Sequence, residues 1–403
     1  MLWQERLTMI SYAEALQKVL ETVSPLAPVE KALSDAAGLV LAAPAIARWD
    51  MPRHNNSAMD GFAIAGAAGK AETDFSIIGS AYAGHPFPGR VLPGQAVLIT
   101  TGASLPDGAD TVLPSEDVLA ENDRVHVTTM PKAGQHVRYR GEEFCHGDVL
   151  AERGTTLQAG TIALLASAGI ERCKVFPRPR VAVISTGDEL VELGQAPEPG
   201  QIVNSNLYFL KSRLTECGFS LASVRKAADD LDKLDQCFDE ALEADIIMST
   251  GGVSVGEKDL LQQALEKQHF KKIFWKVAIK PGKPLLFGRL GHRLYFGLPG
   301  NPGATAATFE LFTKPALKRL AGQIDFLPAK RRAKLTHDVT TGGNRQAFLW
   351  CRLEWHENHY QVTVSKSQGS GQNRCLADAN AMLPVAVGSE KLEAGSDVEV
   401  LMI

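Results

Sequence analysis

Between residues 180 and 322 the sequence alternates short apolar runs with segments of helical periodicity, and this alternation constrains the fold more than any other feature. The predicted elements, in order, are strand 181–185, helix 204–217, strand 220–226, helix 232–243, strand 245–249 and helix 260–267. Such alternation is typical of a mainly parallel sheet wrapped by helices. We therefore predict a doubly wound α/β domain in this part of the chain.

The loop after the third of these strands is the best candidate for a binding site. It reads Ser-Thr-Gly-Gly-Val-Ser-Val-Gly-Glu-Lys-Asp over residues 249–259 and leads into a predicted helix. Its three glycines allow a sharp turn and a close approach of N–H groups to a ligand, and the helix N-terminus favours an anion. The spacing matches neither the Walker pattern nor the dinucleotide fingerprint. The candidate ligand-binding residues are Ser249, Gly251, Gly252 and Ser254.

A second Ser-Thr-Gly triplet occupies residues 185–187, where the first predicted strand ends. Both triplets are followed by acids, Asp188 and Glu189 in one case and Glu257 and Asp259 in the other. In open parallel sheets, ligands bind outside the carboxyl ends of the strands. We therefore expect the active site at these two loops.

Three lysines follow in the segment after the glycine-rich loop. Alternation over residues 274–280 predicts one strand with Lys276 and Lys280 on the same face, and Lys283 and Pro284 lie in the turn beyond it. Charged side chains in a sheet interior need partners, so we favour an anion-binding role. The alternative is a solvated edge strand that lysines protect from pairing.

A second helix start suited to an anion reads Leu-Pro-Gly-Asn-Pro-Gly over residues 298–303. It follows a predicted strand at 294–297 and precedes a predicted helix at 304–320, whose N-terminus a proline can preset. A purely structural turn explains the prolines and glycines as well, but the nearby lysines favour binding. The candidates here are Pro299, Asn301 and Pro302.

The rest of the chain divides by composition. Residues 1–48 contain a capping box at Ser11–Glu14 followed by an amphipathic helix, and residues 138–177 are predicted to be mixed helix and loop. Residues 49–137 are dense in glycine and proline between short β-rich runs, which predicts an inserted β-rich domain. We assign residues 178–326 to the α/β domain and residues 327–403, with short alternating strands, to a last β domain.

Composition and charge exclude several classes of protein. A chain of 403 residues with 45% hydrophobic residues suits several globular domains. With 42 basic and 46 acidic residues its formal charge is −4, so no broad positive field attracts nucleic acid or anionic lipid. Apolar runs are too short to span a membrane, and residues 1–10 lack a signal-peptide core, so we expect a cytoplasmic protein. The six scattered cysteines show no zinc-ligand spacing and are interpreted as reduced thiols.

Carboxylates form the last group of candidates. Each one alone could be an ordinary turn residue or helix cap. Together they need a cation near a phosphate, because two like charges about 4 Å apart repel by roughly 4 kcal/mol at an effective dielectric constant near 20. Mg²⁺ is the natural choice, since carboxylate and phosphate oxygens form its usual shell. The candidates are Asp60, Glu142, Glu143, Glu189, Asp229, Asp230 and Asp259.

Several sequence blocks, in order along nearly the whole chain, resemble one family: the molybdopterin molybdenumtransferases, which are the MoeA proteins and the gephyrin E-domains. The blocks are residues 56–61, 101–103, 140–143, 185–189, 251–259, 280–284 and 297–302. The resemblance implies an N-terminal linker and dimerisation domain that is split into residues 1–48 and 138–177 around the inserted β domain. It also implies a molybdopterin-binding α/β domain, a C-terminal β-barrel and a homodimer with its site at the subunit interface. It also implies the reaction: adenylylated molybdopterin and molybdate give molybdenum cofactor, AMP and water. A molybdopterin adenylyltransferase and acceptor molybdoenzymes are the protein partners that it suggests.

The same resemblance implies roles for individual residues. An acidic cluster would handle Mg²⁺ and the adenylyl phosphate, and Glu189, Asp229 and Asp259 would be the metal ligands. The residues of this cluster are Asp60, Thr101, Glu143, Glu189, Asp229 and Asp259. Molybdate is a tetrahedral dianion that lysines, arginine or backbone donors can hold. Its pocket would consist of Lys280, Lys283 and Pro284 with contributions from Arg345 and Ser370, and Lys276 would neutralise substrate phosphate.

Four departures from the family pattern leave alternatives open. Asn55 stands where the family usually has aspartate, Glu143 replaces an aspartate, Gly303–Thr305 replaces Val-Ser-Ala, and Asn373–Cys375 replaces a serine-containing stretch. One alternative is a divergent paralogue that binds molybdopterin or acts as a scaffold without turnover. Another is a related α/β enzyme that acts on a different nucleotide, because the loop at 251–259 alone does not specify the base.

Overall fold

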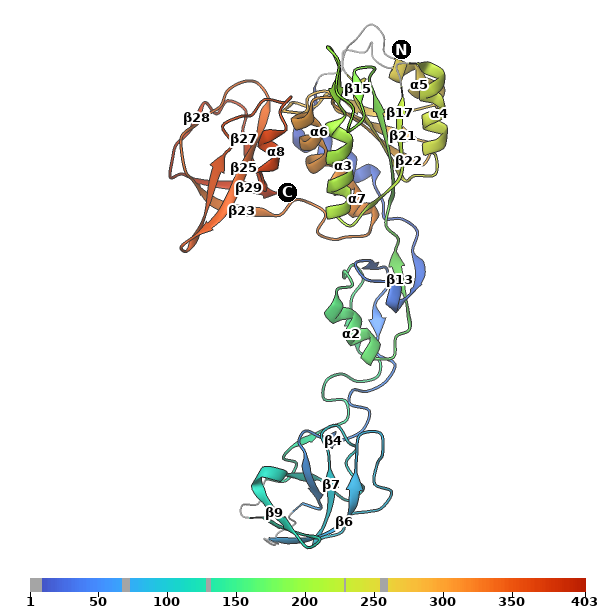
Figure 1. Cartoon of the computed structure of the whole chain (residues 1–403), viewed down its shortest axis with the longest axis vertical. Coiled ribbons are helices and arrows are strands. Elements are labelled where there is room, and N and C mark those ends of the chain that lie inside the picture. Colours follow the sequence, from blue (N-terminus) through green and yellow to red (C-terminus); the bar gives the residue numbers. More distant parts are fainter. Residues whose placement is uncertain (1–8, 67–72, 128–131, 228–229, 254–259) are drawn as a thin grey trace. The chain divides into compact units, whose positions relative to one another are not determined.

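The computed structural model describes residues 9–66, 73–127, 132–227, 230–253 and 260–403. The chain separates into two compact units, whose helices and strands are labelled in Figure 1. The large unit comprises Met1–Val29, Gly38–Ala42 and Val175–Ile403, and the small unit comprises Glu30–Ala37 and Ala43–Lys174. None of the helices in the described part of the chain is long and apolar enough to cross a membrane.

A six-stranded sheet forms the centre of the large unit (Figure 1). In spatial order its strands are β17 (Ser220–Ala227), β14 (Arg180–Thr186), β18 (Ile246–Thr250), β22 (Arg293–Leu298), β21 (Leu286–Leu290) and β19 (Lys271–Trp275). The first four strands pair in parallel, and the last two pair antiparallel at one edge. The prediction of a mainly parallel sheet is confirmed.

Helices cover both faces of this sheet, which confirms the doubly wound arrangement. Alternate residues of β14 enter different cores, with Val181 and Val183 in one and Ala182 and Ile184 in the other. The first core includes buried residues of α1 (Tyr12–Thr22), α3 (Ser205–Glu216), α6 (Pro302–Thr308) and α7 (Lys314–Leu320). The second core includes buried residues of α4 (Leu231–Ala241) and α5 (Leu260–Lys267).

The N-terminal helix α1 begins as its sequence predicts. The backbone N–H of Glu14 donates a 3.2 Å hydrogen bond to the hydroxyl of Ser11, and the backbone N–H of Ser11 donates a 2.8 Å bond to the Glu14 carboxylate. This reciprocal arrangement is a capping box, which satisfies two donors at the helix start. Ala15 and Val19 then face the first core of the large unit.

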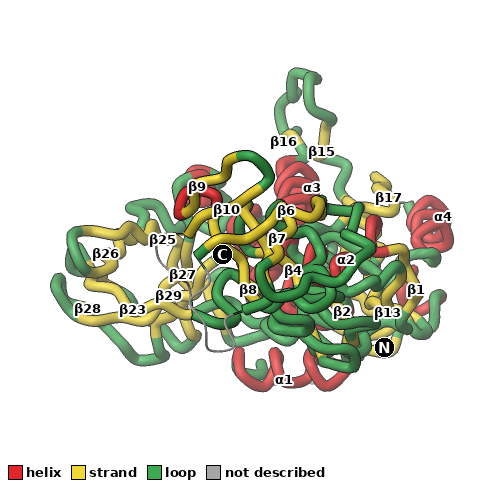
Figure 2. Tube along the Cα trace, turned by 90° about the horizontal axis from the view of Figure 1, so that it is seen from below, coloured by secondary structure: helices red, strands yellow, loops and turns green. Residues whose placement is uncertain are grey.

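The end of the large unit is a closed five-stranded barrel (Figure 2). Its ring consists of β25 (Gln346–His356), β26 (His359–Val364), β23 (Lys330–Leu335), β29 (Asp397–Met402) and β27 (Ala381–Val385), and β27 pairs again with β25. Helix α8 (Arg374–Ala377) and the pair β24 (Val339–Thr340) and β28 (Lys391–Leu392) accompany the ring. The barrel expected from the family resemblance is confirmed.

The predicted single strand at residues 274–280 is wrong. Strand β19 ends at Trp275, and Lys276 adopts a left-handed backbone conformation with φ of 71°. A two-residue strand, β20 (Ile279–Lys280), then pairs in parallel with β25 of the barrel rather than with the α/β sheet. Period-two alternation failed because a residue with positive φ interrupts the extended chain.

The small unit is rich in short strands, as predicted. Its six-stranded sheet has the order β8 (Thr111–Pro114), β5 (Gly61–Ile64), β7 (Gln95–Ile99), β6 (Asp74–Ala81), β10 (Arg124–Val127) and β9 (Val118–Glu121). The other elements of this unit include α2 (Ala159–Ser167) and the paired strands β4 (Asn56–Ser57) and β11 (Val137–Arg138), and β3 (Ala45–Ile46) and β12 (Val149–Ala151). The division of the chain into four domains stays a prediction.

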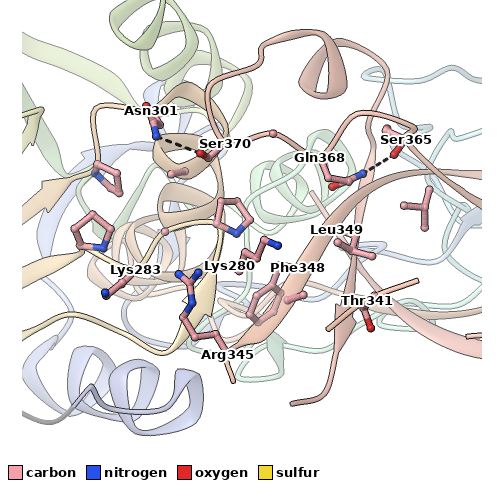
Figure 3. A pocket seen from close by; sticks show the side chains of 18 of the residues that line it. Lys280, Lys283, Asn301, Thr341, Arg345, Phe348, Leu349, Ser365, Gln368 and Ser370 are labelled. Carbon is pink, nitrogen blue, oxygen red and sulfur yellow. Dashed lines mark hydrogen bonds between the residues drawn. The ribbon is translucent and has the colours of Figure 1, made fainter. Parts of the chain in front are cut away.

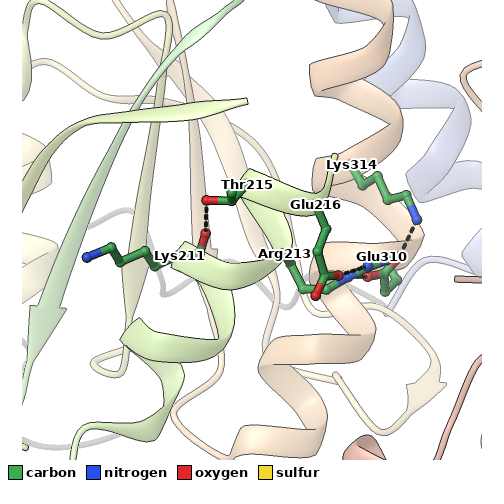
Figure 4. Close-up of polar contacts among 6 residues, drawn as sticks. All are labelled: Lys211, Arg213, Thr215, Glu216, Glu310 and Lys314. Atoms are coloured by element: carbon green, nitrogen blue, oxygen red, sulfur yellow. Dashed lines mark hydrogen bonds and ion pairs between the residues drawn. The ribbon is translucent and has the colours of Figure 1, made fainter. Parts of the chain in front are cut away.

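A buried ion-pair cluster joins α3 to the helix at residues 302–320, whose middle segment, Phe309–Thr313, is π-helical (Figure 4). The Glu310 side chain is only 2% exposed, and its two oxygens accept 2.7 Å hydrogen bonds from Arg213 and Lys314. Arg213 also pairs with Glu216 on its own helix. The cluster compensates for the desolvation of Glu310, because both of its carboxylate oxygens are paired with cations.

Candidate active site

A cavity of about 1050 Å³ lies between the α/β domain and the barrel of the large unit (Figure 3). Its α/β side consists of loops at the carboxyl ends of strands and of the first turn of α6. The loops supply Glu189, Gly251, Gly252, Val253, Pro299, Gly300 and Asn301, and the helix supplies Ala304. The turn at residues 280–284 lies between the two sides. The barrel side includes residues 337–342, Arg345 and residues 364–366 and 368–370.

The two Ser-Thr-Gly triplets lie side by side, as the sheet order requires. Ser185 of β14 is in register with Thr250 of β18, and the Thr186 hydroxyl donates a 3.3 Å hydrogen bond to the Thr250 carbonyl. A side chain at Gly251 would place its Cβ 2.8 Å from the Thr186 carbonyl oxygen, and its φ of 89° disfavours other residues. The glycine therefore allows the two strand ends to approach closely beside the cavity.

Three predicted cations line the cavity together: Lys280, Lys283 and Arg345 (Figure 3). Lys280 belongs to β20, which pairs with β25, and Arg345 donates a 3.1 Å hydrogen bond to the Ile279 carbonyl. The backbone N–H of Val277 bonds the Lys283 carbonyl at 2.9 Å, which fixes the turn between the lysines. The three cations therefore depend on pairing between β20 and the barrel.

Positive charge predominates in the described part of the lining. Four lysine and arginine side chains face two carboxylates, because Lys366 joins the three cations while Glu189 and Asp338 are the acids. Asp338 is already paired with Lys391 at 2.7 Å. Such a cavity attracts anions, particularly tetrahedral oxyanions, which accept hydrogen bonds from ammonium and guanidinium groups.

Lys276 lies outside the described lining of the cavity. Its ammonium group is 3.6 Å from the centroid of the Trp275 ring, and the indole N–H of Trp275 donates a 3.1 Å hydrogen bond to the Val253 carbonyl. Desolvation and the nearby charge of Lys283 lower the pKa of Lys276. The side chain therefore lies close enough to Lys283 to add to the positive potential of the cavity.

The turn at residues 298–303 contacts the barrel directly. The Asn301 side-chain amide donates a 3.1 Å hydrogen bond to the Ser370 hydroxyl (Figure 3). The backbone N–H of Gly303 donates a 2.8 Å bond to the Ser370 carbonyl. A Cβ at Gly303 would lie 3.2 Å from that same carbonyl oxygen. The glycine thus allows a close approach between the start of α6 and the loop that carries Ser370.

The other predicted residues of this region differ in their relation to the cavity. Pro284 and Pro299 line it, whereas Pro302 is the first residue of α6 and lies outside the described lining. Ser249 is fully buried within β18, where its hydroxyl is 2.5 Å from the Tyr295 hydroxyl. It supports the sheet beneath the loop rather than the wall of the cavity.

Three predicted catalytic residues, Asp60, Thr101 and Glu143, lie in the small unit. The backbone N–H and the hydroxyl of Thr101 donate hydrogen bonds of 2.6 and 2.8 Å to one Asp60 oxygen. These two bonds lower the pKa of Asp60, so that it is a carboxylate at neutral pH. Glu143 is exposed, and its backbone N–H bonds the Met51 carbonyl at 3.0 Å.

The predicted residues Asp229, Ser254 and Asp259 lie outside the described residues. Within the described part of the chain, no three His, Cys, Asp or Glu residues group closely enough to hold a metal ion. Glu189 is the described candidate ligand, and its carboxylate lies over Gly187, where an added Cβ would be 2.4 Å from Oε2. A carboxylate in the wall of this cavity is an oxygen ligand of the kind that Mg²⁺ prefers.

Family models match three consecutive parts of the chain. They describe a MoeA N-terminal region (domains I and II) at residues 10–169, a probable molybdopterin-binding domain at 182–319 and a MoeA C-terminal region (domain IV) at 332–403. A molybdopterin molybdenumtransferase of Staphylococcus aureus strain MSSA476 is 33% identical over 404 residues, which cover 99% of this chain and 96% of the relative. This chain belongs to the molybdopterin molybdenumtransferase family.

Another member of the family, the molybdopterin molybdenumtransferase of Nostoc sp. PCC 7120, is 35% identical over 379 residues, which cover 91% of this chain and 87% of the relative. The crystal structure of a molybdopterin biosynthesis MoeA protein from Pyrococcus horikoshii OT3 matches with a TM-score of 0.81 at 28% identity, covering 98% of this chain and 100% of that one. The predicted family and fold class are both confirmed.

Two departures from the molybdenumtransferase pattern have structural explanations. The Asn55 side-chain oxygen accepts a 2.9 Å hydrogen bond from the backbone N–H of Arg140, so the amide still supplies an acceptor where the family usually has a carboxylate. The Thr305 hydroxyl donates a 2.5 Å hydrogen bond to the Pro299 carbonyl and thereby holds the turn before α6. Both substitutions keep polar contacts beside predicted site residues.

Sequence reasoning missed most of the barrel side of the cavity in this molybdenumtransferase. The missed lining residues include His337, Asp338, Thr340, Thr341, Lys366 and Gln368. They come from loops whose ends are fixed by barrel closure, and no local pattern marks them. The Lys-Ser-Gln-Gly-Ser stretch at residues 366–370, next to the predicted Ser370, was the available signal.

Proposed function

We propose that this chain inserts molybdate into adenylylated molybdopterin and releases AMP, as the molybdopterin molybdenumtransferase step of molybdenum cofactor biosynthesis. The observation that carries the proposal is the grouping of Lys280, Lys283 and Arg345 in one cavity beside the glycine-rich loop of the molybdopterin-binding domain. The family membership of the whole chain supports the same activity.

The three cations suit molybdate, which is the substrate that carries the metal. Their ammonium and guanidinium donors neutralise its two negative charges and bond its oxygens, and the Ser370 hydroxyl adds a neutral donor. The 1050 Å³ volume also leaves room for a phosphorylated pterin, because a tetrahedral oxyanion needs only a small part of it.

Adenylylated molybdopterin contains a phosphoanhydride between the adenylate and the pterin phosphate, and this bond breaks when AMP leaves. Catalysis of such a cleavage depends on positioning and on stabilisation of the charge that develops on the leaving phosphate. The backbone N–H of Gly252 and the lysines of the turn at residues 280–284 would supply both, while the N–H of Gly251 bonds the Leu298 carbonyl at 3.3 Å and holds the loop against β22. Mg²⁺ held by Glu189, Asp229 and Asp259 would add further charge neutralisation when bound.

We further propose that Asp60, Thr101 and Glu143 take part in the same reaction and that the protein is a cytoplasmic homodimer. A molybdopterin adenylyltransferase and acceptor molybdoenzymes are its proposed protein partners. The scaffold alternative is less favoured, because the cavity keeps its three cations and its glycine-rich wall.

The test is an AMP-release assay on the purified protein with adenylylated molybdopterin. We expect AMP to appear only when both molybdate and Mg²⁺ are present, and omission of either serves as the control. Tight binding of the pterin substrate without AMP release under all conditions would contradict the proposal and support the scaffold alternative.

A further inference from the structure

Gln368 belongs to the barrel wall of the cavity. Among the described residues of that wall, its side chain makes the most hydrogen bonds. Its Oε1 accepts a 3.0 Å bond from the backbone N–H of Trp350, and its Nε2 donates a 2.9 Å bond to the carbonyl of Trp350. Its Nε2 also donates a 2.8 Å bond to the Ser365 carbonyl (Figure 3). All three bonds therefore link its carboxamide to main-chain atoms.

The Gln368 bonds lie at the point where β26 ends and the chain leaves β25. Strand β26 ends at Val364, which is in register with Cys351 of β25, and Ser365 still donates a 3.0 Å bond to the Trp350 carbonyl. Beyond that point the chain leaves β25, and the Gln368 carboxamide serves as a main-chain-like partner for Trp350. A side chain that replaces a strand partner in this way fixes where the following loop begins.

The far end of the same loop is fixed by Ser370. Its hydroxyl and carbonyl accept the bonds from Asn301 and Gly303 at the start of α6. The loop at residues 365–370 is thus anchored to β25 by Gln368 and to the α/β domain by Ser370. Loss of the Gln368 side-chain bonds would leave the backbone bond of Ser365 to Trp350 but remove the bonds that hold the later part of the loop to β25.

We propose that Gln368 is a positioning residue for oxyanion binding: it holds the loop at 365–370 so that the Ser370 hydroxyl stays in the cavity wall opposite the lysine turn. The inference rests on the proposed function, because it takes molybdate as the anion. Gln368 acts through Ser370 and the loop.

The test compares molybdate binding, by titration calorimetry on the full chain, in the wild type and in Gln368→Met, which keeps the length of the side chain without its hydrogen bonds. We expect molybdate to bind about tenfold more weakly, with kcat at saturating molybdate within twofold of the wild type. Gln372→Met is the matched control, because Gln372 is an exposed glutamine of the neighbouring turn. It should bind molybdate like the wild type.

A double variant separates positioning from general loss of structure. If Gln368 acts through Ser370, Gln368→Met adds little further loss to a Ser370→Ala background, whereas independent effects multiply. Unchanged molybdate affinity in Gln368→Met, or multiplicative effects in the double variant, would overturn the inference.

The same experiments distinguish this inference from the proposed function. A wild-type protein that binds molybdate but never releases AMP refutes the proposed function, while the binding comparison still decides the role of Gln368. Normal AMP release with unaltered molybdate affinity in Gln368→Met refutes the inference alone. Hydrogen exchange gives an independent readout, because the backbone amide of Trp350 should exchange faster in Gln368→Met than in Ser370→Ala.

Discussion

The side chains of Asn301 and Ser370, 69 residues apart in the chain, are joined by a 3.1 Å hydrogen bond. One residue directly precedes helix α6 of the α/β domain, and the other belongs to a loop of the barrel. Because both residues line the cavity, the wall around the anion is formed by two domains at once. The affinity of the cavity for an anion should therefore depend on the contacts between the two domains as well as on the charges of the lining residues.

Lys283→Ala should weaken molybdate binding. The substitution removes one charged donor from the cavity, and hydrogen bonds to charged groups contribute about 1.5–3 kcal/mol, which corresponds to roughly 10- to 100-fold in affinity. Molybdate titrations measure the change. Lys271→Ala, which removes an exposed lysine of β19, is the control and should leave affinity unchanged. Equal affinity in both variants would exclude Lys283 from the anion site.

Glu310→Gln should destabilise the large unit by about 3–5 kcal/mol, because Lys314 would then lose its buried carboxylate partner and Arg213 would keep only the more exposed Glu216. Urea unfolding followed by far-UV circular dichroism measures the loss. The matched control is Glu216→Gln, whose carboxylate is 59% exposed and pairs with the same Arg213. That pair lies at the surface, so its loss should cost no more than about 1 kcal/mol. Equal losses would contradict the interpretation of Glu310.

Thr101→Val should raise the pKa of Asp60. The variant keeps the backbone bond to Asp60 but loses the hydroxyl bond, and both bonds lower that pKa in the wild type. A folded-state pKa below the unfolded value of about 3.9 means that the bonds stabilise the fold above that pH, and that this contribution disappears as the pH falls through the folded-state pKa. Carboxyl-carbon NMR titration measures the shift. An identical Asp60 pKa in both proteins would contradict this role of the hydroxyl.

Cys145 should react with a thiol reagent at pH 8 while Cys351 does not. Cys145 is exposed, whereas burial raises the pKa of Cys351 to about 12 and leaves almost no thiolate. Alkylation followed by peptide mass spectrometry identifies the modified residues. In denaturant all six cysteines should react, which controls for the chemistry. Modification of Cys351 before Cys145 in the native protein would show that the barrel opens readily.

Local patterns predicted the parts of the structure that local physics decides. The capping box at Ser11 and Glu14 marks the true start of α1, and the helical period at residues 260–267 gives the bounds of α5. The alternating elements of residues 180–322 also gave the parallel sheet, because a βα repeat has few other solutions.

What the sequence did not predict depends on contacts between distant segments. Strand β20 pairs with Gln346 and Ala347, 67 residues later, and no pattern around Lys280 indicates that partner. The sequence also did not predict the positive φ of Lys276, because lysine has no preference for that backbone conformation. The barrel wall of the cavity was missed for the same reason: barrel closure brings its loops to the α/β domain.

The pairing of β20 with β25 has a mechanical consequence. The backbone of Lys280 pairs with β25 of the barrel. Trp275 and Leu286, which lie before and after it in the chain, are buried in the core of the α/β domain. The barrel therefore cannot swing away from the α/β domain as a free hinged body while this lysine stays in place. A change in the width of the cavity would either break the pairing of this two-residue strand with β25 or move the turn at residues 280–284, so the geometry of the cavity and the position of the Lys280 charge are coupled.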